Sequence, residues 1–265
     1  MILIFSAFGP TKNYPDQEMM RKTLTAFIDS VINQTDQDYR LFLIGHDKPE
    51  FIEERDNVLW CSLSCDSGNE ETLIPDVLPK KIGDSIGYHS APPRGKMEDM
   101  SRKVREGTIQ AVLWAHENEV KDFWMMRMDS DDLLAADTVE KIHSLDREGF
   151  WAVFNRTCHM FDAKTKQMAV HHYPYSNTPN ALKFVIREDG VVVPDWFYLC
   201  TDHTLFPGRV RRDKIPCKEI DFTYCIVTNT GNSISGRPTL SQVGQTREIP
   251  LTDELIARYS IGGLL

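Results

Sequence analysis

Three aspartates stand within four positions of this 265-residue chain, Asp129, Asp131 and Asp132, directly after the apolar run at 123–128. Carboxylates that meet in a partly buried turn repel one another, so they need a compensating cation to remain ionised. Mg²⁺ and Mn²⁺ suit this role, because they take hard oxygen ligands and are held by one or two carboxylates plus substrate phosphates. The cluster therefore predicts a divalent metal and a nucleotide diphosphate ligand.

The same acidic turn has a second interpretation, because Asp also caps helices that follow strands. Asp132 precedes the next predicted helix and Asp137 lies at its start, so either residue could cap it. An EF-hand calcium loop is excluded, since it needs Gly at its sixth position and a distal Glu, whereas Leu133 and Leu134 follow here. On its own, the acidic motif leaves a ligand-binding role and a capping role open.

Strands and helices alternate in the first half of the chain, and this alternation positions the cluster. Apolar runs predict buried strands at 2–8, 39–45, 58–63, 123–128 and 151–154. Helical spacing of apolar residues predicts helices at 18–33, at 97–118 and from about 136 to 145. In an open α/β sheet, ligands collect beyond the carboxyl ends of the strands, which is where Asp129 falls.

The second half of the chain is richer in predicted strands. Short runs at 157–161 and 168–173 flank a hairpin turn at 162–166, and further runs follow at 191–193, 196–199 and 224–227. The polar stretch 66–94 is interpreted as a long loop. We therefore expect a single α/β domain with a mixed central sheet flanked by helices.

Composition and charge narrow the class of protein. With 41% hydrophobic and 26% charged residues, the chain is neither a disordered tail nor a coiled coil. A net charge of −9 excludes a nucleic-acid polymer as the expected partner. Six scattered cysteines favour reduced thiols in a cytoplasmic protein. No stretch is apolar for long enough to cross a bilayer, although peripheral membrane contact is compatible with the sequence.

Two segments resemble the family 2 glycosyltransferases, which have the GT-A (Rossmann-like) fold. In the first, Ser30-Val31-Ile32-Asn33-Gln34-Thr35 ends a predicted helix that leads into the strand at 39–44. In the second, the segment 123–137 resembles the DxD region of that family, and its core Arg-Met-Asp-Ser-Asp-Asp at 127–132 is similar to that of rhamnosyltransferases. The resemblance implies one GT-A domain over 1–265, in which 1–135 bind the nucleotide sugar and 136–265 bind the acceptor.

The resemblance also implies roles for individual residues. It implies that Asp131 binds Mn²⁺ or Mg²⁺ and that His203 is a further metal ligand. Asp129 would contact the ribose or the metal, and Asp132 would support the carboxylates that bind it. His203 could instead pack beside Trp196 and Phe206. The residues that the resemblance places against the nucleotide sugar are Ala7, Phe8, Asp47, Arg102, Arg105, Asp129 and Ser130. The two arginines could equally be solvated helix residues, and at Asp47 the sequence Gly45-His46-Asp47-Lys48 departs from the acidic pair and Gly-Ser turn of the family.

An inverting transfer needs a carboxylate that deprotonates the acceptor hydroxyl. In the family this base follows the DxD region, and the candidates here are Glu188, Asp189 and Asp202. The expected activity is transfer of a sugar, with rhamnose as one candidate, from a nucleotide-sugar donor to a glycan or other hydroxyl acceptor. The alternatives are a sugar nucleotidyltransferase and a non-catalytic carbohydrate-binding protein of the same fold. His171 and His172 fit either an acceptor pocket or an ordinary strand.

Overall fold

The structure is a computed structural model that describes residues 1–9, 14, 16–53, 55–63, 96–145, 148–192, 206–220, 222–223, 225–229 and 246–265. The strands and helices predicted for the first 145 residues are all present in it. They are β1 (Ile2–Ala7), α1 (Gln17–Ile32), β2 (Tyr39–Gly45), β3 (Val58–Ser62), α3 (Lys96–Glu117), β4 (Asp122–Asp129) and α4 (Thr138–His143). The predicted loop at 66–94 and the predicted strand at 196–199 lie outside the described residues.

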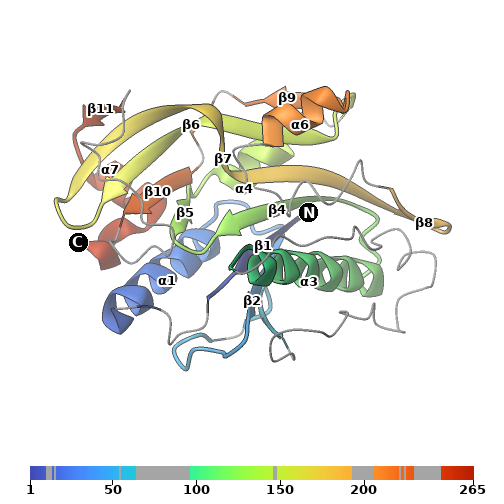
Figure 1. Ribbon diagram of the computed structural model, residues 1–265, viewed down its shortest axis with the longest axis horizontal. Coiled ribbons are helices and arrows are strands. Elements are labelled where there is room, and N and C mark those ends of the chain that lie inside the picture. The colour runs from blue at the N-terminus through green and yellow to red at the C-terminus, as the bar shows by residue number, and fades with distance from the viewer. Residues whose placement is uncertain are drawn as a thin grey trace.

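The first four strands form the parallel part of the sheet. They lie in the order β3-β2-β1-β4, and every neighbouring pair is parallel. In this order β2 and β3 are added outward on one side of β1, and the chain then crosses back to place β4 on the other side of β1, as in Rossmann-like folds. Figure 1 shows α3 lying across one face of these strands. Because the strands are parallel, the segments that follow β1, β2 and β4 emerge at one edge, the carboxyl edge of the sheet.

The antiparallel part of the sheet is built on one long hairpin. β6 (Ala152–Asp162) and β7 (Gln167–Arg187) pair antiparallel around the predicted turn, and β7 also pairs antiparallel with β4. The predicted runs at 151–154 and 157–161 form one strand, because the register shift at Asn155 is absorbed within β6. There the Asn155 side chain accepts a hydrogen bond from the backbone N–H of Thr157 over 2.5 Å. An irregularity of this kind kinks a strand without ending it.

The remaining elements are short and lie around this hairpin. β8 (Gly190–Val192) and β11 (Thr246–Ile249) pair with β7, and β9 (Cys217–Glu219) and β10 (Cys225–Asn229) pair with β6. β5 (Asp132–Leu134), which the sequence did not predict, pairs antiparallel with β10. The helices that complete the fold are α6 (Phe206–Arg212), α7 (Asp253–Tyr259) and the 3₁₀ helix η4 (Ile261–Leu264).

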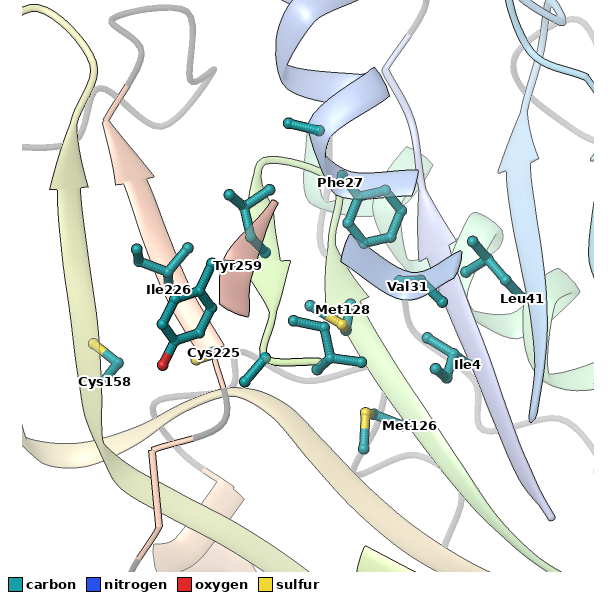
Figure 2. Close-up of a cluster of buried hydrophobic side chains, with 14 of the residues drawn as sticks. Ile4, Phe27, Val31, Leu41, Met126, Met128, Cys158, Cys225, Ile226 and Tyr259 are labelled. Carbon is teal, nitrogen blue, oxygen red and sulfur yellow. The ribbon is translucent and has the colours of Figure 1, made fainter. Parts of the chain in front are cut away.

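The core consists of two buried clusters, one on each face of the parallel strands. Alternate residues of β1 divide between them: Ile4 belongs to the cluster under α1, and Phe5 to the cluster under α3. Figure 2 shows part of the α1 cluster, in which Phe27 and Val31 lie beside Ile4. Both faces of the strands are therefore covered, as their near-continuous apolar sequences predict.

These observations confirm the predicted fold class: a single α/β domain with a mixed central sheet flanked by helices. β4 from the first 135 residues pairs directly with β7 from the remainder, so the two predicted halves share one sheet. The described residues include four cysteines that are not joined in disulfides, Cys61, Cys158, Cys217 and Cys225. Among the described helices, none combines the length and the apolar character that crossing a membrane requires.

Candidate functional site

The acidic cluster lies at a reversal of the chain on the carboxyl edge of the sheet. β4 ends at Asp129, Ser130 and Asp131 form the turn, and β5 begins at Asp132. In the sheet register Asp129 is paired with Ala7, the last residue of β1. Two of the predicted site segments, the exit of β1 and the acidic turn, are therefore adjacent in space. This placement agrees with the expectation drawn from the strand order alone.

Asp129 is partly shielded and ion-paired. Its carboxylate lies 3.3 Å from the guanidinium of Arg127, and the side chains are 20% and 12% exposed, respectively. Both residues point to the α3 face, because Phe123 and Met125 of the same strand lie in the cluster under α3 and side chains alternate along a strand. The Arg127 guanidinium partly neutralises the charge that a metal would otherwise compensate. Sequence analysis did not single out this arginine, although its two-residue spacing from Asp129 places both side chains on one face.

The turn residues contact Tyr14, which the sequence analysis also missed. Its hydroxyl is hydrogen-bonded to the Ser130 side chain and to the backbone of Gly9. Burial raises the pKa of Tyr14, and the negative charge of Asp131 raises it further, whereas the two hydrogen bonds act in the opposite direction. On the other side of the turn, the hydroxyl of Thr228 donates a hydrogen bond to the backbone carbonyl of Asp131. The turn is thus held from β10 and from the segment after β1.

Neither Asp132 nor Asp137 caps α4 with its side chain, although the sequence left that role open for both. Asp132 is 1% exposed and belongs to β5, so its backbone is engaged in a strand. Asp137 occupies the N-cap position of α4, but its side chain makes no capping hydrogen bond. It pairs instead with Lys141 at 2.7 Å and Arg258 at 3.1 Å. Burial alone would raise the pKa of Asp137, but these two cations outweigh burial and lower it.

Gln34 supplies the cap of α4. Its side-chain oxygen accepts from the backbone N–H of Val139 at 3.0 Å, and its amide nitrogen donates to the carbonyl of Ala135 at 2.8 Å. Ser30, one turn earlier in α1, accepts from the backbone N–H of Leu134 at 3.0 Å. Both side chains are almost fully buried. The two segments on which the resemblance rests, separated by about one hundred positions, are therefore bonded to each other in the fold.

The exit of β1 is closed by aromatic packing. Ala7 and Phe8 are 8% and 4% exposed, and the Phe8 ring stacks on Trp60 with a centroid separation of 6.1 Å. Gly45 makes this stacking possible, because a Cβ there would come within 2.6 Å of the Trp60 ring. Asp47, two residues beyond β2, is exposed at the same edge. The structure thus gathers Ala7, Phe8 and Asp47 near one another, with the two apolar side chains serving mainly as core.

The expected cations of α3 are placed only in part. Arg105 is half-buried on the helix, whereas the side chain of Arg102 lies outside the described residues. Gly107 packs against the Phe5 ring, since a Cβ at this position would lie only 3.0 Å from it. α3 runs antiparallel to β4, and Arg105 precedes Gly107 in the helix. Arg105 therefore lies nearer than Gly107 to the carboxyl edge of the sheet. Lys103, only 1% exposed, is a buried cation of the same helix that the sequence analysis missed. The available signal was that Lys103 lies four residues before Gly107, which puts both residues on the same face of the helix.

Two predicted base candidates lie far from the acidic turn. Glu188 and Asp189 are exposed in the turn between β7 and β8. Val185 of β7 pairs with Asp122 at the beginning of β4, whereas Asp129 ends that strand. Seven residues at about 3.3 Å each, roughly 23 Å, separate the two ends. The structure therefore corrects the expectation that Glu188 or Asp189 joins Asp129 in one site. Both residues were chosen by their position along the chain, which does not reveal that β7 runs antiparallel to β4.

Other predicted residues fall outside the described part of the chain or have a structural role. Asp202 and His203 belong to the undescribed stretch 193–205. His171 is 4% exposed in β7, opposite Cys158 of β6. That placement fits the strand interpretation of His171. The side chain of His172 is not among those described.

The donor set of the turn is compatible with a divalent cation that shares its coordination with a ligand. The part of the chain that the structure describes contains no group of three or more His, Cys, Asp or Glu side chains placed to hold a metal by themselves. Mg²⁺ and Mn²⁺ do not require such a group, because one or two carboxylates and substrate phosphates complete their shell. Asp131 and Asp129, at one turn on the carboxyl edge, could provide those carboxylates.

Comparison of the chain with known protein families and with curated proteins finds no match. The class that the fold defines is therefore stated from the structure alone: an α/β domain whose parallel strands have Rossmann-like order and whose acidic turn lies at the carboxyl edge.

Proposed function

We propose that this protein is a cytoplasmic, metal-dependent glycosyltransferase that takes its sugar from a nucleotide-sugar donor. The observation that carries the proposal is the position of Asp129, Ser130 and Asp131, which form a tight turn at the carboxyl edge beside the exit of β1. In a sheet of this order, that edge is where nucleotides bind. The connection from Ser30 and Gln34 to the segment after the turn supports the proposal, because the resemblance rests on the same residues.

In the proposed reaction, Mn²⁺ or Mg²⁺ would neutralise the leaving diphosphate as a Lewis acid. Asp131 would hold the metal, and Asp129 would contact either the metal or the ribose. Tyr14 and Thr228 fix the turn that presents these carboxylates. A base must remove the proton of the acceptor hydroxyl. Since Glu188 and Asp189 lie at the other end of β4, Asp202 is the candidate from the sequence that this proposal retains.

Nucleotide binding tests the proposal directly. UDP, GDP and dTDP are titrated against the protein with and without Mn²⁺, and at least one of them should bind in a metal-dependent way. Asp131→Ala should abolish this binding. Asp189→Ala is the matched control, because it removes the same charge from an exposed turn at the opposite end of β4. If no nucleotide binds, or if the two variants lose binding equally, the proposal is wrong. Hydrolysis of a panel of nucleotide sugars then identifies the donor.

One observation favours a second candidate, a non-catalytic carbohydrate-binding protein of the same fold. The ion pair between Arg127 and Asp129 stabilises a carboxylate at the turn without any metal. In that case the acidic turn is a structural feature, and the chain should bind sugars without nucleotide or Mn²⁺. Binding of free oligosaccharides in the presence of a chelator distinguishes this candidate from the first.

A further inference from the structure

Positive charge is concentrated in one short segment of this acidic chain. Residues 206–220, which contain α6 and β9, carry five basic and two acidic side chains, a net charge of +3. The whole chain has a net charge of −9, so the other 250 residues together carry −12. We call residues 206–220 the basic segment; its five cations are Arg209, Arg211, Arg212, Lys214 and Lys218.

The fold presents these cations outward because α6 buries its apolar residues. Phe206 and Val210 are fully buried in the cluster under α3, and the Phe206 ring meets Phe154 of β6 edge-on at 6.5 Å. The opposite side of the helix is consequently left in water: Arg211 and Arg212 are 53% and 70% exposed. The short helix is thus anchored by its apolar side and displays arginine on the other.

The segment after α6 carries two further exposed lysines, of which Lys218, paired with Val153, lies on the other face of the sheet from α6. Lys214, at a positive φ of 56°, ends the turn that follows the helix, and both Lys214 and Lys218 are exposed. The ammonium group of Lys218 lies over the Phe150 ring, 5.5 Å from its centroid, in a cation–π contact. In Figure 1, α6 and β9 lie together at the top of the view, on the side of the molecule away from α1 and β2.

The two carboxylates of the basic segment do not cancel its charge. Glu219 lies between two guanidinium groups, 3.4 Å from Arg211 and 3.5 Å from Arg156 of β6. Both arginines also lie over the Phe154 ring, at 5.3 and 5.9 Å. One acidic side chain is therefore shared by two cations, and Arg156 adds positive charge from outside the segment. Asp213 pairs with Arg212 at 2.7 Å, which leaves a net excess of cations across this surface.

A planar anionic surface fits this distribution better than a polyanionic chain does. An extended nucleic acid would also meet the acidic remainder of the protein, which repels it. A membrane contacts only the face that is turned toward it. At physiological ionic strength, charges more than about 8 Å from the membrane are largely screened, so the acidic residues on the far side oppose docking only weakly.

We propose that the basic segment docks this protein on bilayers that contain anionic phospholipid. Arg211, Arg212 and Lys214, three exposed cations on and directly after α6, contact the headgroup phosphates, and Arg209 and Lys218 add to the local potential. Attachment is electrostatic and reversible, because among the described residues the segment exposes no large apolar side chain that could insert into the hydrocarbon. The proposal does not depend on nucleotide binding at the acidic turn.

Co-sedimentation with vesicles tests it. The full chain is mixed at low salt with vesicles of phosphatidylcholine alone and of phosphatidylcholine with phosphatidylglycerol. The protein should sediment only with the anionic vesicles, and rising salt should release it. The variant Arg211→Gln, Arg212→Gln, Lys214→Gln should bind at least about tenfold more weakly, since each basic side chain near an anionic surface contributes to the affinity.

A matched variant removes the same charge elsewhere. Lys22→Gln, Lys48→Gln, Lys164→Gln changes three exposed lysines outside the basic segment, and it should sediment like the unaltered protein. Thermal unfolding of both variants checks that each is folded. The proposal is overturned if the unaltered protein ignores anionic vesicles at low salt, if both variants lose binding equally, or if duplex DNA binds more tightly than the vesicles do.

Discussion

The hydroxyl of Ser30 accepts a hydrogen bond from the backbone N–H of Leu134, 104 positions further along the chain, over 3.0 Å. The same hydroxyl donates to the carbonyl of Phe27 at 2.7 Å, so it uses both of its hydrogen-bonding capacities in the core. This side chain attaches the end of α1 to β5, the strand that begins immediately after the acidic turn.

Ser30→Ala tests the strength of this attachment. The change leaves the buried N–H of Leu134 without its acceptor, which should lower the free energy of unfolding by about 1–3 kcal/mol. Urea denaturation measures the loss. Thr35→Ala is a suitable control, because the Thr35 hydroxyl bonds the exposed carboxylate of Glu140 and its removal should cost under about 1 kcal/mol. Equal losses in the two variants would mean that Ser30 is not a buried connection.

Gly45 is predicted to be intolerant of a side chain. A Cβ at this position would lie 2.6 Å from the rigid ring of Trp60, which is itself stacked on Phe8. Gly45→Ala should therefore destabilise the protein by about 1–3 kcal/mol, the usual range for overpacking. In thermal or urea unfolding, the double variant Gly45→Ala, Trp60→Leu should be less destabilised than the sum of the two single changes. Strict additivity would show that the contact with Trp60 is not the cause.

Arg127 is predicted to hold down the affinity of the acidic turn for a cation. Its guanidinium lies 3.3 Å from Asp129, so Arg127→Gln removes a repulsive charge from the proposed metal site. The affinity for Mn²⁺ alone, measured by calorimetry, should rise about three- to tenfold, and Asp129→Asn should lower it. If both variants lose thermal stability while Mn²⁺ binding stays the same, the pair is a structural ion pair.

Tyr14 is predicted to support ligand binding through Ser130. Tyr14→Phe removes the hydroxyl that bonds the Ser130 side chain, and the turn loses one of its restraints. Metal-dependent nucleotide affinity should fall about two- to tenfold, as expected for one hydrogen bond. Tyr39→Phe is the control, because the Tyr39 hydroxyl accepts a hydrogen bond from Asn57 at the start of β2, the end of that strand away from the carboxyl edge. A Tyr39 variant that weakens nucleotide binding as much as Tyr14→Phe would contradict this role.

His159 is predicted to make stability depend on pH. Burial, and to a smaller extent the charge of Arg258, lowers the pKa of His159 from 6.5 to about 4, and its ring is hydrogen-bonded to the hydroxyl of Tyr259 at 2.8 Å. Figure 2 shows Tyr259 beside Cys158, Cys225 and Ile226. Between pH 6.5 and 4 the unfolded chain therefore binds a proton that the folded protein does not, so stability falls as the pH falls.

The size of this effect follows from the displacement of the pKa. At about 1.4 kcal/mol per pH unit, the full loss between pH 6.5 and 4 is roughly 3 kcal/mol. His159→Gln should give a flatter profile of unfolding free energy against pH over this interval. Asp137, whose pKa is lowered, contributes stability that is lost only as the pH falls below its unfolded value of about 3.8. An unchanged slope in the His159 variant would rule out this histidine as the source.

The parallel half of the fold could be predicted because its sequence signals are local. β1 and β2 are continuous apolar runs, and the apolar spacing of α1 identifies the helix within one residue at each end. β5 could not be predicted, because its three residues form a strand only through pairing with β10, which lies about 90 positions away. The same limit explains β7, whose polar middle carries no alternation and whose ends are held by distant strands, by β6 and β11 near its start and by β6 and β4 near its end.

The candidate site could be predicted only where chain order decides its geometry. Asp129 follows a parallel strand, so its place at the carboxyl edge and beside Ala7 follows from sequence. Tyr14 and Lys103 were missed, because one lies outside any predicted element and the other is a charged residue in a buried position. Glu188 was placed by resemblance, and the antiparallel path of β7 moves it to the opposite end of the sheet.

The course of β7 also has a consequence for how the chain folds. β7 completes its hydrogen bonds only when β4, β6, β8 and β11 are all in place, and these strands span almost the entire second half of the sequence. A nascent chain that ends near residue 135 would expose the full edge of β4, which is a template for aggregation. Folding must therefore wait for contacts of high sequence separation, which slows it, and unfolding should proceed as one cooperative transition with no stable N-terminal half.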